Sequence, residues 1–328
     1  MESLIFALNA VLPIILMVLI GYFLKKIGFM KPEFSKAANK LVFRAFLPAM
    51  LFLNVYRIEN IAEMNFGYAL YAVVSLLILT AVMTPVVIIF TAKKNQRGVL
   101  LQSIFRSNYA LIGIPLASAL FGDEGVIVAT LLSAVIVPVF NVLAVVCLSV
   151  FKEGKTKIDF KSVFIEILKN PLIQSIAAGL VVLGIRALFV KWGFEFRLTD
   201  ITPLEKVLNY LSNMATPMAL IVLGAQFDFS AVSSMKREII FGSVMRTLIV
   251  PLVGLGGAYL LFRDSFGGAE FAALVAMFAT PVAVSSVPMA QEMEGDVTLA
   301  GQLVVWTTIL SSGSIFLSSY LLKLAGIF

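Results

Sequence analysis

The chain has 328 residues, of which 60% are hydrophobic and only 13% are charged, and its mean hydropathy is +1.00. A soluble globular domain of this composition would expose a largely apolar surface, so the composition excludes one and indicates an all-α polytopic membrane protein. The apolar runs are long and continuous, unlike the short alternating strands of a transmembrane barrel. The net charge of +6 indicates basic cytoplasmic loops, and nucleic acid is not expected as a partner because basic runs are not interleaved with aromatic residues.

Ten apolar segments are predicted to cross the bilayer, since each span needs roughly 20 residues. The first span is followed by Lys25 and Lys26, whereas a cleavable signal carries its basic residues in front, so this span is expected to be retained with the N-terminus outside. In chain order, the predicted spans are 4–24, 38–56, 66–92, 98–121, 125–151, 167–189, 206–227, 239–262, 270–291 and 297–322.

The basic residues between these spans are unevenly divided between the two sides. Fifteen lie in the loops that follow odd-numbered spans, and seven lie on the other side. Because Lys and Arg collect on cytoplasmic loops, the first side is predicted to face the cytoplasm of a plasma (inner) membrane, with both termini outside. The loop with Glu292, Glu294 and Asp296 is acidic, but acidic residues contribute little to orientation.

Prolines recur in matching spans of the two halves of the chain. The pairs are Pro13 and Pro171, Pro48 and Pro217, Pro85 and Pro251, and Pro115 and Pro288. Five spans per half is an odd number, so the second half would enter the membrane upside down, which predicts an inverted five-plus-five repeat. The predicted divisions are 1–151 for the first repeat, 152–163 for a short cytoplasmic linker and 164–328 for the second repeat.

The fourth and ninth spans are predicted to be broken helices that cross at the centre of the membrane. Residues 115–123 align without a gap with residues 288–296, with four identities in nine positions. Paired interruptions at matching positions indicate a transporter's binding site, and restarting half-helices would present their positive N-termini there. The alternative is that Pro115 and Pro288 only kink intact helices. The residues expected to satisfy freed backbone groups are Asn108, Gly113, Pro281, Ser285 and Ser286.

Two arginines are predicted to lie near the membrane midplane. Arg106 and Arg246 each come nine residues after a basic residue near the cytoplasmic surface, roughly 14 Å along a helix. A central arginine costs several kcal/mol, so each should have a partner. One interpretation is that they bind an anionic substrate, since no Asp or Glu lies deep in a predicted span. The other is that each ties helix ends or backbone carbonyls together.

The remaining polar residues offer little support for catalysis. Asn141 lies mid-span and either reaches the same centre or forms a helix–helix hydrogen bond; Asn54, Asn213 and Gln226 support weaker versions of this argument. The chain has no histidine, one cysteine, no pair of membrane-depth carboxylates and no phosphate-binding Gly-Lys-Ser/Thr motif. We therefore expect neither an enzyme nor a primary pump, and no cofactor or metal.

The stretch SNYALIGIPLASALFG, with its counterpart TPVAVSSVPMAQEMEGD, resembles the auxin efflux carrier family, specifically its bacterial members. The core of the likeness is Asn108, Gly113, Ile114, Pro115 and Leu116, and the resemblance covers essentially the whole chain. It implies a homodimer in which spans 1, 2, 6 and 7 form a scaffold and spans 3–5 and 8–10 a transport domain.

The resemblance also implies elevator-like movement of an organic anion, with malate, malonate or related carboxylates as bacterial substrates. Asn108 and Asn141 carry over as substrate contacts. Whether Pro281 or Pro288 marks the second crossing stays open. The alternative function is a sodium-coupled organic-anion symporter of the bile-acid-carrier type, which would need clustered oxygen ligands; a membrane sensor or scaffold is a third possibility.

Overall fold

The structure is a computed structural model that describes residues 2–57, 66–152, 160–194 and 196–328. These residues form helices joined by short loops, with no β-strand among them beyond one isolated bridge. Seven helices are long and apolar enough to cross a membrane, which confirms an all-helical, multi-pass chain. The ten spans and the inverted repeat stay predictions, and most of the predicted linker, 153–159, lies outside the described residues.

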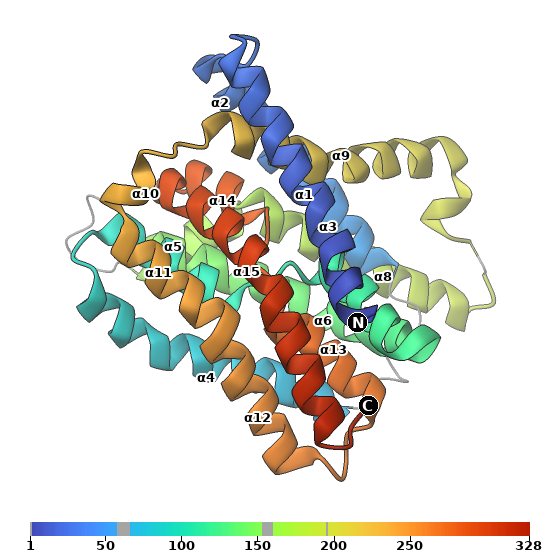
Figure 1. Cartoon of the computed structure of the whole chain (residues 1–328). Coiled ribbons are helices and arrows are strands. Elements are labelled where there is room, and N and C mark those ends of the chain that lie inside the picture. The colour runs from blue at the N-terminus through green and yellow to red at the C-terminus, as the bar shows by residue number, and fades with distance from the viewer. Residues whose placement is uncertain (1, 58–65, 153–159, 195) are drawn as a thin grey trace.

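The helices follow one another in this order: α1 (Glu2–Lys26), α2 (Pro32–Leu41), η1 (Val42–Phe46), α3 (Leu47–Tyr56), α4 (Phe66–Phe90), α5 (Lys94–Phe105), η3 (Tyr109–Gly113), α6 (Ile114–Val150), α7 (Phe160–Lys169), α8 (Pro171–Lys191), η4 (Leu198–Asp200), α9 (Thr202–Gln226), α10 (Ala231–Ser234), α11 (Lys236–Val244), η5 (Met245–Ile249), α12 (Val250–Phe262), α13 (Gly268–Phe278), α14 (Ser286–Glu292) and α15 (Val297–Leu324) (Figure 1).

Three of these elements, η1, η3 and η5, are five-residue π-helical turns, and each is followed by one residue and then a proline. The prolines are Pro48, Pro115 and Pro251. A proline ring clashes with the carbonyl of the residue four positions earlier. The wider turn relieves the clash, because the residue before each proline donates to a carbonyl five positions earlier, as Leu47 N–H does to Val42 O. These prolines therefore widen their helices locally without ending them.

Helix α1 packs on α9, and α3 packs on both α8 and α9. Glycines permit the closest of these approaches, because a Cβ on Gly21 would collide with the carbonyl of Ile221 and one on Gly224 with that of Val18. Elsewhere, α13 and α5 pack against α6, and α15 lies against α1, α11 and α14. The contact between α1 and α15 joins the first group, α1, α3, α8 and α9, to the second group, which contains α5, α6, α13 and α15.

Five loops gather at one end of the molecule. Lys25 donates to the carbonyl of Phe227, the N–H of Asp296 donates to the carbonyl of Asn95 at 3.1 Å, and Lys152 pairs with Glu294 at 2.8 Å. These are the loops for which the sequence predicts a cytoplasmic location. The acidic loop before α15 lies among them, where its carboxylates face basic side chains.

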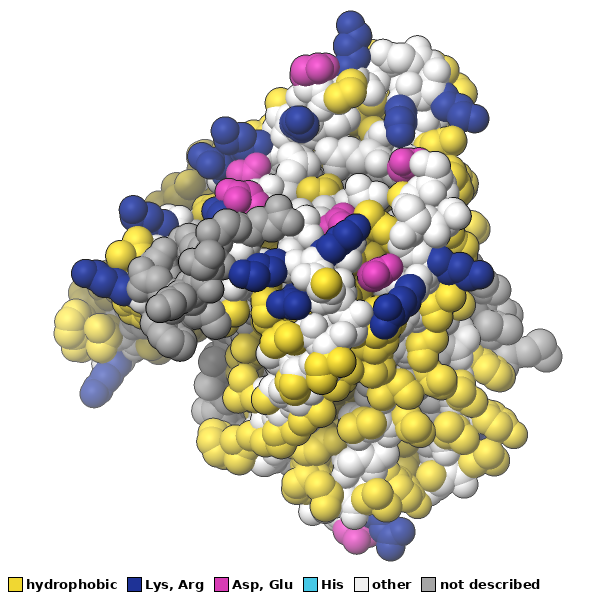
Figure 2. Space-filling model, turned by 90° about the vertical axis from the view of Figure 1, so that its left-hand side faces the viewer, with side chains coloured by type: hydrophobic (Ala, Val, Ile, Leu, Met, Phe, Trp, Pro, Cys, Tyr) yellow, Lys and Arg dark blue, Asp and Glu magenta, His cyan; other side chains and the backbone are white. Residues whose placement is uncertain are grey.

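The outer faces of the helices are apolar. Large hydrophobic side chains such as Ile89 of α4 and Leu260 of α12 are exposed. Figure 2 shows hydrophobic side chains covering the lower part of one face, with most of the visible charged side chains near the upper end. This division suits a bilayer around the apolar part and water at the charged end.

Candidate functional site

Two interrupted helices meet at the centre of the molecule. The chain is non-helical at 106–108, between α5 and η3, and again at 279–285, between α13 and α14. The two breaks pair as a short antiparallel bridge between Ser107 and Val282. Within it, Asn108 N–H donates to the carbonyl of Pro281 at 2.8 Å, and Ala283 N–H donates to that of Arg106 at 3.3 Å. The breaks thus satisfy part of each other's backbone.

The interruptions lie upstream of the prolines that the sequence analysis placed at the breaks. Pro115 is the second residue of α6 and Pro288 the third of α14, so both lie in restarting half-helices. Pro281 is the proline that lies in the second break and pairs with Asn108, which answers the question that the sequence left open between Pro281 and Pro288. The reason is physical: a proline early in a helix forfeits an N–H that has no helical partner anyway, and the turn of η3 accommodates Pro115.

A cavity of about 710 Å³ lies beside this crossing, between it and helices α1, α3 and α9. None of the described residues that line it is charged. The crossing and the start of α6 contribute Asn108, Ala110, Leu111, Pro115, Val284 and Ser285; α1 and α3 contribute Pro13, Ile14, Met17, Leu47, Met50 and Asn54; and α9 contributes Ser212, Asn213, Ala215, Thr216, Pro217, Ala219 and Leu220. Polar groups therefore occur on both the crossing and the α9 wall.

A smaller cavity of about 50 Å³ shares several of these lining residues, among them Asn54, Asn108 and Ser285, and is also lined by Arg106 and Asn141. In the part of the chain that the structure describes, Arg106 is the only charged side chain that lines either cavity. The positive charge therefore lies at the first break, on the wall of the smaller cavity.

Arg106 is 3% exposed, and neutral groups hold its guanidinium. Its Nη2 donates to the side-chain oxygen of Asn141 and to Ser285 Oγ, both at 2.8 Å. Its Nη1 contacts the sulfur of Met289. None of these partners carries a charge, so the positive charge of Arg106 is oriented by its neighbours without being neutralised by them.

Asn108 is the second polar side chain at the crossing. It is 9% exposed, it lines both cavities, and its side-chain nitrogen has no hydrogen-bond partner among the described residues. A buried amide donor without a partner costs free energy. An acceptor on a bound molecule would satisfy it.

Arg246 has a different environment from Arg106. It is fully buried, and its three nitrogens donate to the backbone carbonyls of Ile104, Phe105, Met277 and Thr280 at 2.7–3.4 Å. The first three carbonyls belong to the C-terminal ends of α5 and α13, where helix dipoles are negative, and that of Thr280 lies two residues beyond α13. Arg246 therefore ties the two helix ends together, which is the second of the two interpretations drawn from the sequence.

The predicted site residues separate into two groups. Arg106, Asn108, Pro115, Asn141 and Ser285 line the cavities. The other predicted residues do not line them: Gly113, Ile114, Pro281, Ser286, Pro288 and Arg246. Of these, Gly113 packs closely against Ala276 of α13. Ser212 and Thr216 line the larger cavity without having been singled out. Ser212 is adjacent to Asn213 and Thr216 follows it by about one helical turn, which was the available signal.

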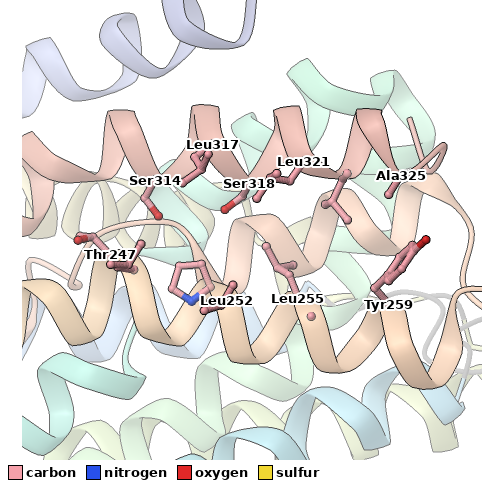
Figure 3. Close-up of a pocket in the computed structure, with 13 residues that line it drawn as sticks. Thr247, Leu252, Leu255, Tyr259, Ser314, Leu317, Ser318, Leu321 and Ala325 are labelled. Atoms are coloured by element: carbon pink, nitrogen blue, oxygen red, sulfur yellow. The ribbon is translucent and has the colours of Figure 1, made fainter.

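Elsewhere, an apolar groove of about 210 Å³ lies between α12 and α15, and Figure 3 shows side chains of both helices facing it, including Leu255, Tyr259 and Leu321. It is remote in sequence from the crossing and lacks charge. Within the described ranges, no three His, Cys, Asp or Glu side chains gather as metal ligands would.

Comparison with known proteins gives one matching family and two relatives. A family model described as membrane transport protein matches residues 6–318. An uncharacterized transporter of Methanothermobacter thermautotrophicus is 25% identical over 321 residues, covering 96% of this chain and 98% of the relative. The uncharacterized transporter MJ1031 of Methanocaldococcus jannaschii is 25% identical over 312 residues, covering 93% and 95%.

Proposed function

The chain belongs to the membrane transport protein family, the auxin efflux carrier family that its sequence resembles, and on this basis we propose that it carries a small organic anion across the membrane. The proposed substrate is a mono- or dicarboxylate, moved without coupling to ATP or a metal. The cavities beside the crossing form the proposed binding site.

The observation that carries this proposal is the isolated charge of Arg106. Among the described residues it is the only charged side chain lining the two cavities, and its hydrogen-bond partners are neutral. A cation would be repelled from this site. A neutral solute would leave a buried guanidinium without a counter-charge, at a cost of several kcal/mol. A carboxylate supplies that charge and accepts charge-assisted N–H bonds from an arginine.

Neighbouring groups add donors around the same position. The side-chain nitrogen of Asn108 lacks a partner, and the first N–H groups of η3 have no helical acceptor by the geometry of a helix start. Asn54, Asn213 and Thr216 lie on the opposite walls and offer hydrogen bonds to the rest of the substrate. A cavity of about 710 Å³ is within the usual size range of small-molecule sites.

We propose an elevator mechanism for the movement. In this scheme the ten predicted spans form an inverted repeat, a dimerising scaffold contains α1, α3, α8 and α9, and the crossing travels with the remaining helices. The close α1–α9 packing at Gly21 and Gly224 supports a rigid scaffold. The ties from Arg246 to α5 and α13 support movement of the crossing as one body.

Export is the proposed net direction, across a plasma membrane with both termini outside. An inside-negative potential favours outward movement of an anion by about 2.3 kcal/mol per charge per 100 mV. The proposed transport is therefore voltage-sensitive.

The experiment is a flux screen in proteoliposomes. Radiolabelled carboxylates from acetate to malate are offered to the wild-type protein, to Arg106→Gln and to Lys36→Gln, an exposed lysine on α2 that serves as the matched control. We expect anion flux in the wild type and the control, and its loss in Arg106→Gln. Selective transport of a cation, or a requirement for sodium, would overturn the proposal.

A further inference from the structure

A second polar cavity, of about 460 Å³, lies at the charged end of the molecule. Among the described residues, three basic side chains line it: Arg44 of η1, Lys152 after α6, and Lys169 at the end of α7. We call this cavity the basic vestibule. Its other lining residues are Phe43, Ser149, Asn170, Pro171, Gln174, Glu292 and Met293.

The two cavities beside the crossing together form the central site. The basic vestibule is stacked on this site along shared structural elements. On α6, Asn141 lines the central site and Ser149 the vestibule, eight residues or about 12 Å further along the axis. On α8, Leu172 lines the central site while Pro171 lines the vestibule. The fully buried side chain of Leu172 lies at this boundary. The central site and the basic vestibule therefore lie one after the other along these helices.

Two further parts of the chain line the two cavities in the same order. Leu47 lines the central site and Arg44 the vestibule, one turn apart across η1 and α3. Ser285, at the second break, lines the central site, and Glu292, at the far end of α14, lines the vestibule. Helices of the proposed scaffold and helices that would move with the crossing thus line both cavities.

The charges of the vestibule favour an anion. Arg44 pairs with Glu292 at 3.5 Å and Lys152 with Glu294 at 2.8 Å, whereas Lys169 has no ion-pair partner among the described residues. Ser149 is 1% exposed, and its hydroxyl has no hydrogen-bond partner among the described residues. An incoming carboxylate would find an unpaired lysine and an unused hydroxyl, and it would compete with Glu292 for Arg44.

We propose that the basic vestibule is a second binding station for a small carboxylate, at the opposite mouth of the pathway from the larger cavity. This inference rests on the proposed anion transport, and it adds a site at which the anion is held before entering or after leaving the centre. Lys169 and Arg44 attract the carboxylate, Ser149 donates to it, and Glu292 sets its affinity by competition.

The test measures charge in the vestibule independently of transport. In the full-length protein with Cys147→Ser, a cysteine replaces Gln174, which is exposed and lines the vestibule. Its thiolate is labelled with an anionic (sulfonatoethyl) or a cationic (trimethylammonioethyl) methanethiosulfonate, forming a mixed disulfide and releasing methanesulfinate. The readout is the ratio of the anionic to the cationic labelling rate.

Lys169→Gln and Arg44→Gln should each lower this ratio about threefold, the effect of one unit charge at several ångströms in a wet site. Glu292→Gln should raise it by a similar factor, and Lys36→Gln, outside the vestibule, should leave it unchanged. An unchanged ratio in both Lys169→Gln and Arg44→Gln would overturn the inference. The opposite direction of Glu292→Gln guards against variants that only disturb folding.

A second arm separates this station from the central site. Malonate should slow labelling of the Gln174→Cys thiol even when Arg106→Gln removes the central charge, and Lys169→Gln should weaken that protection several-fold. If protection disappears with Arg106→Gln alone, the vestibule holds no anion of its own. If only vesicles rich in phosphatidylglycerol protect the thiol, its occupant is a lipid headgroup and the inference fails. Loss of flux in Arg106→Gln tests the proposed function separately from both results.

Discussion

The Nη2 atom of Arg106 lies 2.8 Å from the side-chain oxygen of Asn141, which follows it by 35 residues on the next helix. This bond joins the first break to α6 and points the guanidinium at the small cavity. Because Asn141 is neutral, it orients the charge and leaves it available to an anion. Arg246, at a similar predicted depth, donates only to backbone carbonyls. This difference between the two arginines leads to distinct predictions.

Replacing Arg106 should weaken anion binding. Arg106→Gln removes a charge-assisted hydrogen bond, about 1.5–3 kcal/mol, so the apparent affinity for the carboxylate should fall by tenfold to a hundredfold. Arg106→Lys keeps the charge without the two-pronged geometry and should lie between the wild type and Arg106→Gln. Concentration-dependent uptake in proteoliposomes gives the values. Equal affinities in all three proteins would show that Arg106 does not contact the substrate.

Replacing Arg246 should lower stability more than Arg106→Gln does. Arg246→Gln leaves several buried carbonyls at the ends of α5 and α13 without donors, and we expect a loss of at least about 3 kcal/mol. Thermal unfolding in detergent, followed by tryptophan fluorescence, measures the difference. The matched variant is Arg106→Gln, whose partners border a cavity. A melting temperature of Arg246→Gln at or above that of Arg106→Gln would contradict the assigned role.

Asn108→Asp tests the sign of the potential at the crossing. The change is nearly isosteric, but it puts a negative charge beside the proposed carboxylate, a repulsion of about 4 kcal/mol at 4 Å in a partly wet site. Anion flux should fall at least about a hundredfold. Asn108→Ala, which only removes a donor, should cost about tenfold. If Asn108→Asp carries the anion as fast as Asn108→Ala, the substrate does not approach this residue.

The two prolines of the second interrupted helix should differ in importance. Pro281 is buried in the non-helical break, and alanine there introduces a buried N–H and lets α13 extend. Pro288 lies in the first turn of α14, where an N–H needs no helical partner. We expect Pro281→Ala to reduce flux several-fold and Pro288→Ala to change it by less than about twofold. The reverse order would return the crossing to Pro288.

The orientation in the membrane can be tested by labelling. In the Cys147→Ser background, a cysteine at Lys93, between α4 and α5, should react with an impermeant maleimide only from the cytoplasmic side. A cysteine at Asp123, exposed beyond the first part of α6, should react only from outside. The opposite pattern in intact cells and inverted vesicles would reverse the predicted topology and would place the charged end of the molecule, with the basic vestibule, outside.

Composition and local pattern determined much about this protein. Long apolar segments require helices in lipid because each backbone group must be satisfied internally, so the multi-pass helical class was predictable. The stretch around Asn108 and Pro115 carried the family likeness that the comparisons confirm. Polar residues in an apolar span also indicated the first break, since placing polar side chains within the membrane costs free energy and therefore marks a functional position. These inferences depend on residues close together in the chain.

Tertiary structure decided what the sequence left open. Arg106 and Arg246 each follow a basic residue by nine positions, so sequence spacing predicted the same depth for both. Their roles depend on partners far along the chain: Ser285 for Arg106, and Ile104 and Thr280 for Arg246. The choice of Pro281 over Pro288 likewise depends on its pairing with Asn108. A hydrogen bond forms only where folding brings donor and acceptor within about 3 Å, and local sequence does not encode that distance.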